Sequence, residues 1–308
     1  MTEQEILKQI EELKKQLEEI QANKEVGTDA GLSMDEAEKE LQHQEDLQRI
    51  RGFRLIDDDF MNVCFDDNVE GTELLLRIIL DNPTINVKSV KTQKVMKNLT
   101  GRDIWLDIDA RDDTGKEFNV EVQRADKGAE RKRARYHSSI KDAYMLRPGD
   151  DFSKLPESYV IFITENDVMK GGLPIYPVER VITSTGEPFN DGEHIVYVNG
   201  DNKDSATALG KLMHDFFCTD PNDMHYKQLA DKVRYFKENE EGVRTMCATL
   251  EKMRDETAKK AAEQATERTK VQMALDMIKD GKLSIEDIAK YSRLAIERVK
   301  ELTNLQPV

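Results

Sequence analysis

Two acidic residues on neighbouring segments, Asp107 and Glu121, have the residue type and spacing that could carry out chemistry. The segments 102–110 and 117–123 alternate polar and apolar residues, as strands with one buried face do. The turn between them ends in Gly115, which suits the left-handed last position of a three-residue hairpin loop. This loop sets a register in which Asp107 lies opposite Glu121, with their Cβ atoms about 5 Å apart.

The same register gives the hairpin one polar face and one apolar face. Besides the two acids, the polar face carries Trp105, Asp109, Asn119 and Gln123. The apolar face consists of Ile104, Leu106, Ile108, Phe118, Val120 and Val122. We therefore expect the apolar face to lie against the core.

The two facing carboxylates predict a metal site. Like charges repel, so the pair favours a cation between Asp107 and Glu121. Oxygen ligands suit magnesium or manganese, and either ion can lower the pKa of a bound water and neutralise charge on a phosphoryl group. The amide of Gln123 would orient a water molecule or donate to a phosphate oxygen, although it cannot neutralise charge as a lysine would. This chemistry is phosphodiester hydrolysis.

A helix predicted from about residue 126 to 146 follows the hairpin and is rich in basic residues. We expect phosphate contacts from Arg124, Lys127, Arg131, Lys132 and Arg135. Like charges four residues apart destabilise an isolated helix, which favours an anionic partner. The alternatives are that the helix presents a solvated charged face and that the acids only decorate the solvent face of the hairpin.

Four other residues have two interpretations each. Asp59 would act as a further catalytic carboxylate or would be a helix-capping or loop residue. Glu73, on the first helix of the domain, would be a further carboxylate of the site or would lie outside it. Trp105 would stack on a base or shield the site, or would pack in the structure. His137 would contact phosphate, or would be a helix histidine whose hydrogen bonds are satisfied.

The surrounding segments predict a mixed α/β domain over about residues 51–200. An apolar helix, 72–80, is stopped by Asn82 and Pro83. Strands are expected at 87–96, 102–110, 117–123, 159–163 and 194–198.

Residues 1–50 are predicted to form a separate helical appendage. Its apolar residues recur with the spacing of a short coiled coil, at Ile6, Ile10, Leu13, Leu17 and Ile20. This seam would either pair two copies of the chain as a homo-oligomer or lie on its own chain. A second helix is expected to open with a capping box at Ser33 and Glu36.

Two further helical regions follow the α/β domain. Residues 201–280 have no strand pattern. Residues 281–308 have the outline of a helix-turn-helix, although Arg293 stands where a glycine is usual. We expect this tail to be a small accessory module.

Composition restricts the function and the location of the 308-residue chain. Its net charge of −15 excludes attraction to nucleic acid over the whole surface, and residues 1–50 alone hold 14 acidic and 6 basic residues. Three isolated cysteines provide neither a disulfide framework nor a zinc spacing, so carboxylates would have to hold any metal. The chain has no apolar run of membrane-spanning length and no signal-peptide pattern, so a cytoplasmic protein without a membrane partner is expected.

Several segments in this order carry a family resemblance. They are Asp59-Phe60 and Phe65 ahead of an apolar helix, Gly101 to Ile108, the turn ending at Gly115, Val120 to Gln123, and Arg135 to His137. Over about residues 53–200, the chain resembles the PD-(D/E)XK nuclease family transposases, also called the Rpn family of recombination-promoting nucleases.

The resemblance implies a restriction-endonuclease-like α/β fold, in which helices flank a mixed central sheet, with helical appendages at both ends. It implies that Asp107 and Glu121 are the metal ligands and that Gln123 occupies the place usually held by lysine in the wider superfamily. Asp59 resembles the acid that opens the family's first block. The expected function is that of a Mg²⁺-dependent DNA endonuclease of recombination or mobile-element type. The alternative is a catalytically degenerate nuclease fold that acts as a DNA-associated or oligomeric scaffold.

Overall fold

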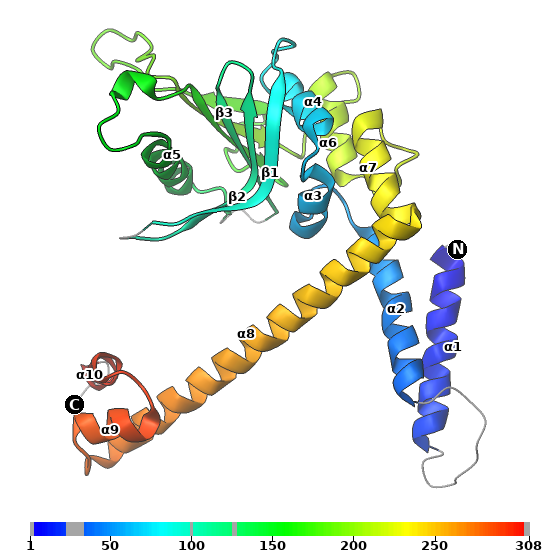
Figure 1. Ribbon diagram of the computed structural model, residues 1–308, viewed down its shortest axis with the longest axis vertical. Helices are drawn as coiled ribbons and strands as arrows, with labels where there is room; N and C mark the ends of the chain where they lie inside the picture. The colour runs from blue at the N-terminus through cyan, green and yellow to red at the C-terminus, as the bar shows by residue number, and fades with distance from the viewer. Residues whose placement is uncertain (1–2, 23–33, 99–100, 125–127, 305–308) are drawn as a thin grey trace. The chain divides into compact units, whose positions relative to one another are not determined.

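A computed structural model describes residues 3–22, 34–98, 101–124 and 128–304 (Figure 1). The chain divides into two compact units, Met1–Thr245 and Met246–Val308. The predicted domain boundaries at residues 50, 200 and 280 stay a prediction. No helix in the described part of the chain is both long and apolar enough to cross a membrane.

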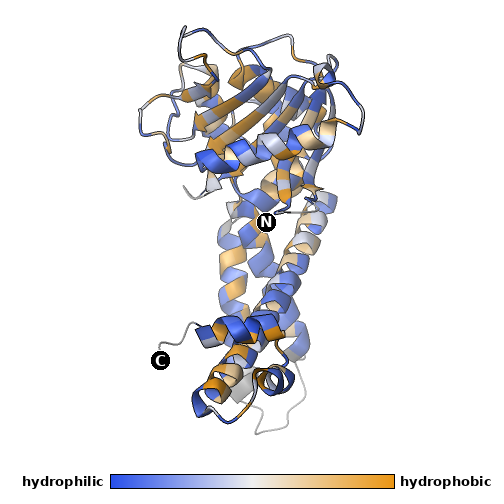
Figure 2. Cartoon of the chain, turned by 90° about the vertical axis from the view of Figure 1, so that its left-hand side faces the viewer, coloured by the Kyte–Doolittle hydropathy of each residue, from blue (hydrophilic) through white to orange (hydrophobic). Residues whose placement is uncertain are grey.

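A six-stranded mixed sheet forms the centre of the first unit, with the strand order β1-β2-β3-β4-β6-β5. The strands are β1 (Val87–Met96), β2 (Ile104–Asp112), β3 (Glu117–Gln123), β4 (Ser158–Thr164), β5 (Ile175–Val178) and β6 (Glu193–Asn199). The pairs β1-β2, β2-β3 and β5-β6 are antiparallel, whereas β3, β4 and β6 run parallel. Figure 2 shows apolar residues concentrated on these strands. The predicted α/β fold with a mixed central sheet is confirmed.

The hairpin of β2 and β3 has the predicted register. Its pairs run from Arg111 opposite Glu117 to Ile108 opposite Val120, and Gly115 has the expected left-handed backbone with φ of 91°. Beyond these pairs, β2 continues beside β1 as far as Ile104 opposite Met96. The first residues of β2 therefore extend past the part that pairs with β3.

Helices cover both faces of this sheet (Figure 1). On one side lies α5 (Arg131–Met145), where Ala129 and Ala134 pack on Val160, Phe162 and Tyr197. On the other side lie α3 (Asp58–Phe65), α4 (Val69–Ile79), α6 (Ala208–Phe217) and α7 (Lys227–Glu238). A short 3₁₀ helix spans Phe152–Lys154. The six residues of the predicted apolar hairpin face are all buried.

Two elements depart from the sequence prediction. The helix α3 was not predicted, and the acidic run 57–59 lies at its start, because a buried apolar face follows the run in Phe60, Met61 and Cys64. The strand β5 was not expected, and it is a short edge strand that contains Pro177, a residue tolerated at edges.

The N-terminal seam is covered within the chain itself. The helices α1 (Glu3–Ala22) and α2 (Met34–Gly52) pack side by side (Figure 1). Ile6, Ile10, Leu13 and Leu17 are at most 9% exposed. The alternative of a helix that lies on its own chain therefore describes these residues, and an oligomer contact through α1 stays a prediction. Ser33, of the predicted capping box, lies outside the described residues.

Lys237 on α7 ties together three segments of the first unit. Its ammonium donates to the carbonyl oxygens of Arg51, Phe53 and Thr219 at 2.8, 2.5 and 2.6 Å. Burial lowers the pKa of Lys237 to about 8, while the three carbonyl oxygens stabilise its charged form. This side chain fixes the end of α2 against α7.

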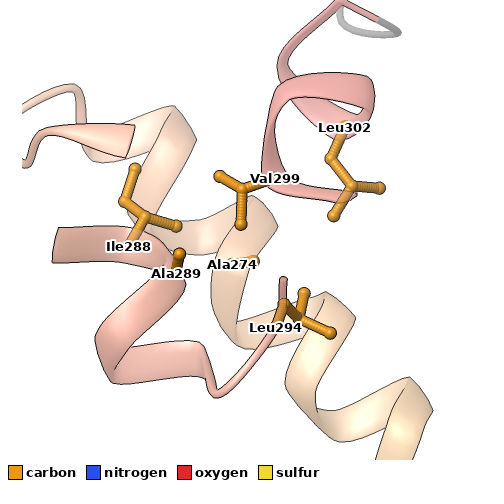
Figure 3. Packing of buried hydrophobic residues seen from close by; sticks show 6 residues of the cluster. All are labelled: Ala274, Ile288, Ala289, Leu294, Val299 and Leu302. Atoms are coloured by element: carbon orange, nitrogen blue, oxygen red, sulfur yellow. The ribbon is translucent and has the colours of Figure 1, made fainter. Parts of the chain in front are cut away.

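The second unit contains most of α8 (Glu240–Asp280), with α9 (Ile285–Ser292) and α10 (Ile296–Asn304). Figure 3 shows its core, formed by Ala274, Ile288, Ala289, Leu294, Val299 and Leu302. Ser284 caps α9 by accepting from the Asp287 N–H at 3.1 Å, and Arg293 at the turn has the left-handed φ of 58° that favours glycine. The two predicted tail helices are confirmed.

Replacing Lys237 by methionine should lower the free energy of unfolding by about 2–4 kcal/mol, because one buried and two partly buried carbonyl oxygens lose their donor. Urea unfolding at neutral pH measures the change. The control is Lys227→Met, since Lys227 is exposed and pairs only locally with Asp231; a change below about 0.5 kcal/mol is expected there. Equal effects of the two substitutions would contradict the role given to Lys237.

Candidate active site

Asp107 and Glu121 come together where β2 and β3 separate. Glu121 on β3 is completely buried, and Asp107 on β2 is half-buried. Asp107 Oδ2 accepts a hydrogen bond from the Val122 N–H at 2.9 Å, so the carboxylate bonds to the backbone of β3. Burial, followed by the charge of Glu121, raises the pKa of Asp107 to about 8. The structure thus brings the two predicted carboxylates into electrostatic contact.

Two residues of α5 compensate the buried charge of Glu121. Arg133 Nη2 lies 3.1 Å from Glu121 Oε2, and Arg133 Nε donates to His137 Nε2 at 3.3 Å. Because this Nε2 accepts, a neutral His137 carries its proton on Nδ1, which lies 3.6 Å from Glu121 Oε1. That oxygen is buried and has no hydrogen-bond partner among the described residues.

His137 itself is only 4% exposed. Its Nδ1 also lies 3.4 Å from the side-chain nitrogen of Asn119, but a proton on Nδ1 prevents that nitrogen from donating to it. Arg133 is thus the hydrogen-bond partner of one ring nitrogen, and both interpretations of His137 stay predictions.

A third carboxylate reaches the pair from α3, and it is Asp58. The charge of Asp58 contributes to the raised pKa of Asp107. Burial raises the pKa of Asp58, and the charges of Asp59, Asp57 and then Glu121 raise it further. Asp59 lies in the first turn of α3 and lines a pocket together with Asp57, Asp58 and Arg124. The predicted residue thus lies beside the site, with its neighbour Asp58 coupled to the two carboxylates.

Gln123 lies at the end of β3, beside the chain that leads into α5. Its side chain is so close to Gly128 that a Cβ on Gly128 would lie 1.6 Å from Gln123 Oε1. Arg133 Nη1 lies 3.5 Å from the same oxygen. Gly128 therefore leaves room for the amide, and Arg133 donates to its oxygen.

Glu73 lies away from this site. Its Oε2 accepts from the Val87 N–H at 3.0 Å, and its Oε1 pairs with Arg77 at 2.8 Å. The carboxylate joins α4 to β1 and has a structural position.

The predicted phosphate-binding residues fall into three groups. Lys127 lies outside the described residues. Arg124 pairs with Asp57 at 2.9 Å and with Glu165 at 3.6 Å, so these pairs would have to open before it bound phosphate. The exposed residues Arg131, Lys132 and Arg135 lie on the outer side of α5.

A groove beside α5 carries accessible positive charge near the site. It is lined by Arg102, Lys132, Arg133 and Arg135, and also by Trp105. The indole of Trp105 is 58% exposed, so the interpretation of Trp105 as a packing residue is wrong. Because Arg133 also contacts Glu121, the groove reaches the carboxylates.

A second set of charges lies buried between α5 and the sheet. Lys141 has no exposed side-chain surface, and its Nζ lies 3.4 Å from Asp109 Oδ1 and 3.8 Å from Glu117 Oε2. Burial lowers the pKa of Lys141. Lys94 on β1 contacts the other oxygen of Asp109 at 2.5 Å. The polar hairpin face is therefore covered by α5, which argues against the alternative that its acids only decorate a solvent face.

One other group of candidate ligands occurs among the described residues, formed by His214, Asp215 and His225. Both carboxylate oxygens of Asp215 accept backbone N–H bonds at 2.8 Å, from His225 and Tyr226. Asp215 thereby anchors the loop before α7.

Sequence reasoning missed Asp58 as a neighbour of the two carboxylates and Arg133 as the partner of Glu121. The spacing of Arg133, His137 and Lys141 by four residues is a signal that could have identified an inward stripe of α5. Asp58 offered no such signal within its acidic run.

In metal-free buffer, the free energy of unfolding should fall as the pH rises from about 4 to 8, because the folded protein holds a proton on Asp107 that the unfolded chain releases near 3.8. Asp107→Asn removes this carboxyl group and keeps an acceptor for Val122. The variant should be more stable than the parent near pH 8 by roughly 1–3 kcal/mol. Urea unfolding in EDTA at pH 5 and pH 8 measures this.

The control for this prediction is Asp113→Asn in the exposed hairpin turn, which should leave the pH dependence unchanged. The same slope with pH for the parent and Asp107→Asn would contradict the burial of charge at this site.

One comparison with known proteins identifies the family of the chain. The family model described as PD-(D/E)XK nuclease family transposase matches residues 72–280. No curated protein and no solved structure matches the chain. The matched range covers about two thirds of the sequence and includes Asp107, Glu121 and Gln123, while α3 with Asp58 precedes it. The chain belongs to the PD-(D/E)XK nuclease family of transposases.

Proposed function

We propose that this protein is a metal-dependent DNA endonuclease of recombination or mobile-element type, and that it hydrolyses phosphodiester bonds at Asp107 and Glu121. Family membership supports a nuclease or transposase type of function. The observation that carries the proposal is the burial of one carboxylate beside another, with Glu121 Oε1 left without a hydrogen-bond partner among the described residues.

The residues present fit a divalent cation. A buried carboxylate oxygen without a donor is destabilising, and a raised pKa at Asp107 means that a second negative charge is opposed. A cation held by Asp107 and Glu121 would relieve both effects. Carboxylate oxygens are the ligands that Mg²⁺ and Mn²⁺ prefer, and Asp58 is the third acid close enough to contribute charge.

A bound Mg²⁺ or Mn²⁺ ion would activate water and neutralise charge on the phosphate. The chain's own residues position the reactants. Gln123 shares Arg133 with Glu121, and from there its amide can orient a water molecule or donate to a phosphate oxygen. Arg133 supplies a positive charge that Gln123 lacks, and it lies within reach of both Gln123 and Glu121.

DNA would approach along the groove beside α5. Lys132 and Arg135 are exposed there and can contact phosphates without reading bases. The groove provides a local positive surface on a chain whose net charge is −15. Arg131 would add a contact on the outer side of the same helix.

The alternative function is a DNA-associated or oligomeric scaffold with a degenerate nuclease site. Two observations favour it: glutamine stands where the superfamily usually has lysine, and Arg133 already neutralises Glu121. Only the endonuclease should cut DNA, so cleavage distinguishes the two functions.

The full-length protein should nick supercoiled plasmid in Mg²⁺ or Mn²⁺ and should not do so in EDTA. Asp107→Ala should reduce nicking at least 100-fold, because it removes a carboxylate that holds the ion. The matched control is Asp113→Ala, an exposed acid in the turn of the same hairpin, which should nick like the parent. Metal-dependent nicking by Asp107→Ala at the parental rate would exclude this site, and no nicking by the parent would favour the scaffold.

Lys132→Ala combined with Arg135→Ala should weaken binding to all DNA sequences equally and should reduce the slope of log K against log salt by about 1–2. The reason is that a variant with fewer phosphate contacts releases fewer counterions when it binds. Filter binding from low to moderate salt measures the slope. Arg147→Ala with Lys154→Ala removes two exposed charges from the segment after α5 and serves as the control. An unchanged slope in the first variant would favour the alternative that α5 presents a solvated charged face without binding DNA.

A further inference from the structure

Trp105, the one tryptophan of the chain, is exposed to solvent beside the candidate active site. An indole is large and apolar, and proteins usually bury most of its surface. Trp105 is 58% exposed, whereas Ile104 and Leu106 on either side of it are at most 3% exposed. Ile104 and Leu106 are therefore packed inside the protein, whereas the indole of Trp105 is free to contact a bound molecule.

Its position on β2 relates it to the carboxylates. Trp105 pairs with Val95 on β1, in the part of β2 that extends past its pairing with β3. It precedes Asp107 by two residues, and its groove is also lined by Arg133 and His137, which lie 3.1 and 3.6 Å from the two carboxylate oxygens of Glu121. A group stacked on the indole would therefore lie in a groove that adjoins the carboxylates.

The groove around Trp105 combines an aromatic face with positive charge. Four basic residues line it, Arg102, Lys132, Arg133 and Arg135, against two acidic ones, Asp103 and Glu130. An aromatic platform between cations is the arrangement that binds single-stranded nucleic acid, in which bases stack and phosphates pair with cations. An apolar protein partner would not need the four basic side chains.

We propose that Trp105 is a base-stacking platform and that the site prefers DNA with an unpaired base next to the cleaved bond. This inference rests on the proposed endonuclease function. Inside a duplex, both faces of each base are covered by its neighbours in the stack. An indole covers a base face without the cost of wedging the stack apart only where the base is unpaired, terminal or turned out of the helix. The substrate class is therefore DNA with a flap, bulge or single-stranded segment.

Because Trp105 is the chain's one tryptophan, the unlabelled protein reports its own stacking. The test uses Asp107→Asn, which binds without cutting, and measures tryptophan emission during titration with three DNAs. These are a fully paired duplex, the same duplex with one unpaired base, and a single strand. We expect the two DNAs with unpaired bases to quench the emission and to bind roughly 5- to 100-fold more tightly than the duplex.

Substitutions of Trp105 and of its β1 partner Val95 distinguish base stacking on the indole from general affinity for DNA. Trp105→Ala, read by anisotropy of labelled DNA, should bring all three affinities to the same value, and Trp105→Phe should keep part of the preference. Val95→Ala is the matched control, since Val95 is the exposed partner of Trp105 across the ribbon. It should keep the whole preference.

Three results would overturn the proposal: equal quenching by the paired duplex, loss of affinity by the same factor for all three DNAs in Trp105→Ala, or an emission change that depends on protein concentration without DNA. The last result would mean that a second copy covers the indole. If the parent nicks through Asp107 but Trp105→Ala keeps the preference, only the stacking role fails. If no DNA binds or is cut, the endonuclease function fails together with it.

Discussion

The burial of Glu121 beside Asp107 is the constraint on which this part of the molecule depends. A carboxylate without exposed surface must be compensated by the element that covers it, and here that element is α5. The helix turns Arg133, His137 and Lys141 toward the sheet, one every fourth residue. Its packing on β3 is therefore electrostatic as well as apolar.

This arrangement divides the basic residues of α5 between two tasks. The inward stripe balances buried acids on β2 and β3, whereas Arg131, Lys132 and Arg135 stay in solvent. A helix that buries charge in this way is held in one orientation, because any rotation would leave buried carboxylates unpaired. Because α5 residues line the groove that contains Trp105, the fixed orientation of the helix also sets the shape of this groove.

Much of the fold could be predicted because the signals were local. The alternation of residues and Gly115 were enough to give the β2-β3 register, and the apolar face follows from it. The roles of Asp58 and Arg133 depend on how α3 and α5 dock on the sheet, which no spacing within the hairpin reveals. The same holds for the polar hairpin face, where the sequence could not tell a solvent face from one covered by a charged helix.

The site was predictable only as far as the hairpin reaches. Asp107 and Glu121 are brought together by the strand register, but the contact of Asp107 with the Val122 N–H arises where the strands part. Trp105 had two interpretations because burial is a property of tertiary structure. Its exposure depends on where α5 lies relative to β2, which the sequence of the strand does not specify.

The three carbonyl contacts of Lys237 also affect the order in which the first unit can fold during synthesis. Its bond to Phe53 joins residues 184 positions apart in the chain. At synthesis rates of 5–20 residues per second, the loop at Phe53 waits about 10–40 s on the ribosome for its donor. The N-terminal half of the first unit is thus exposed to chaperones and proteases as an incomplete structure, and it closes only when α7 has emerged.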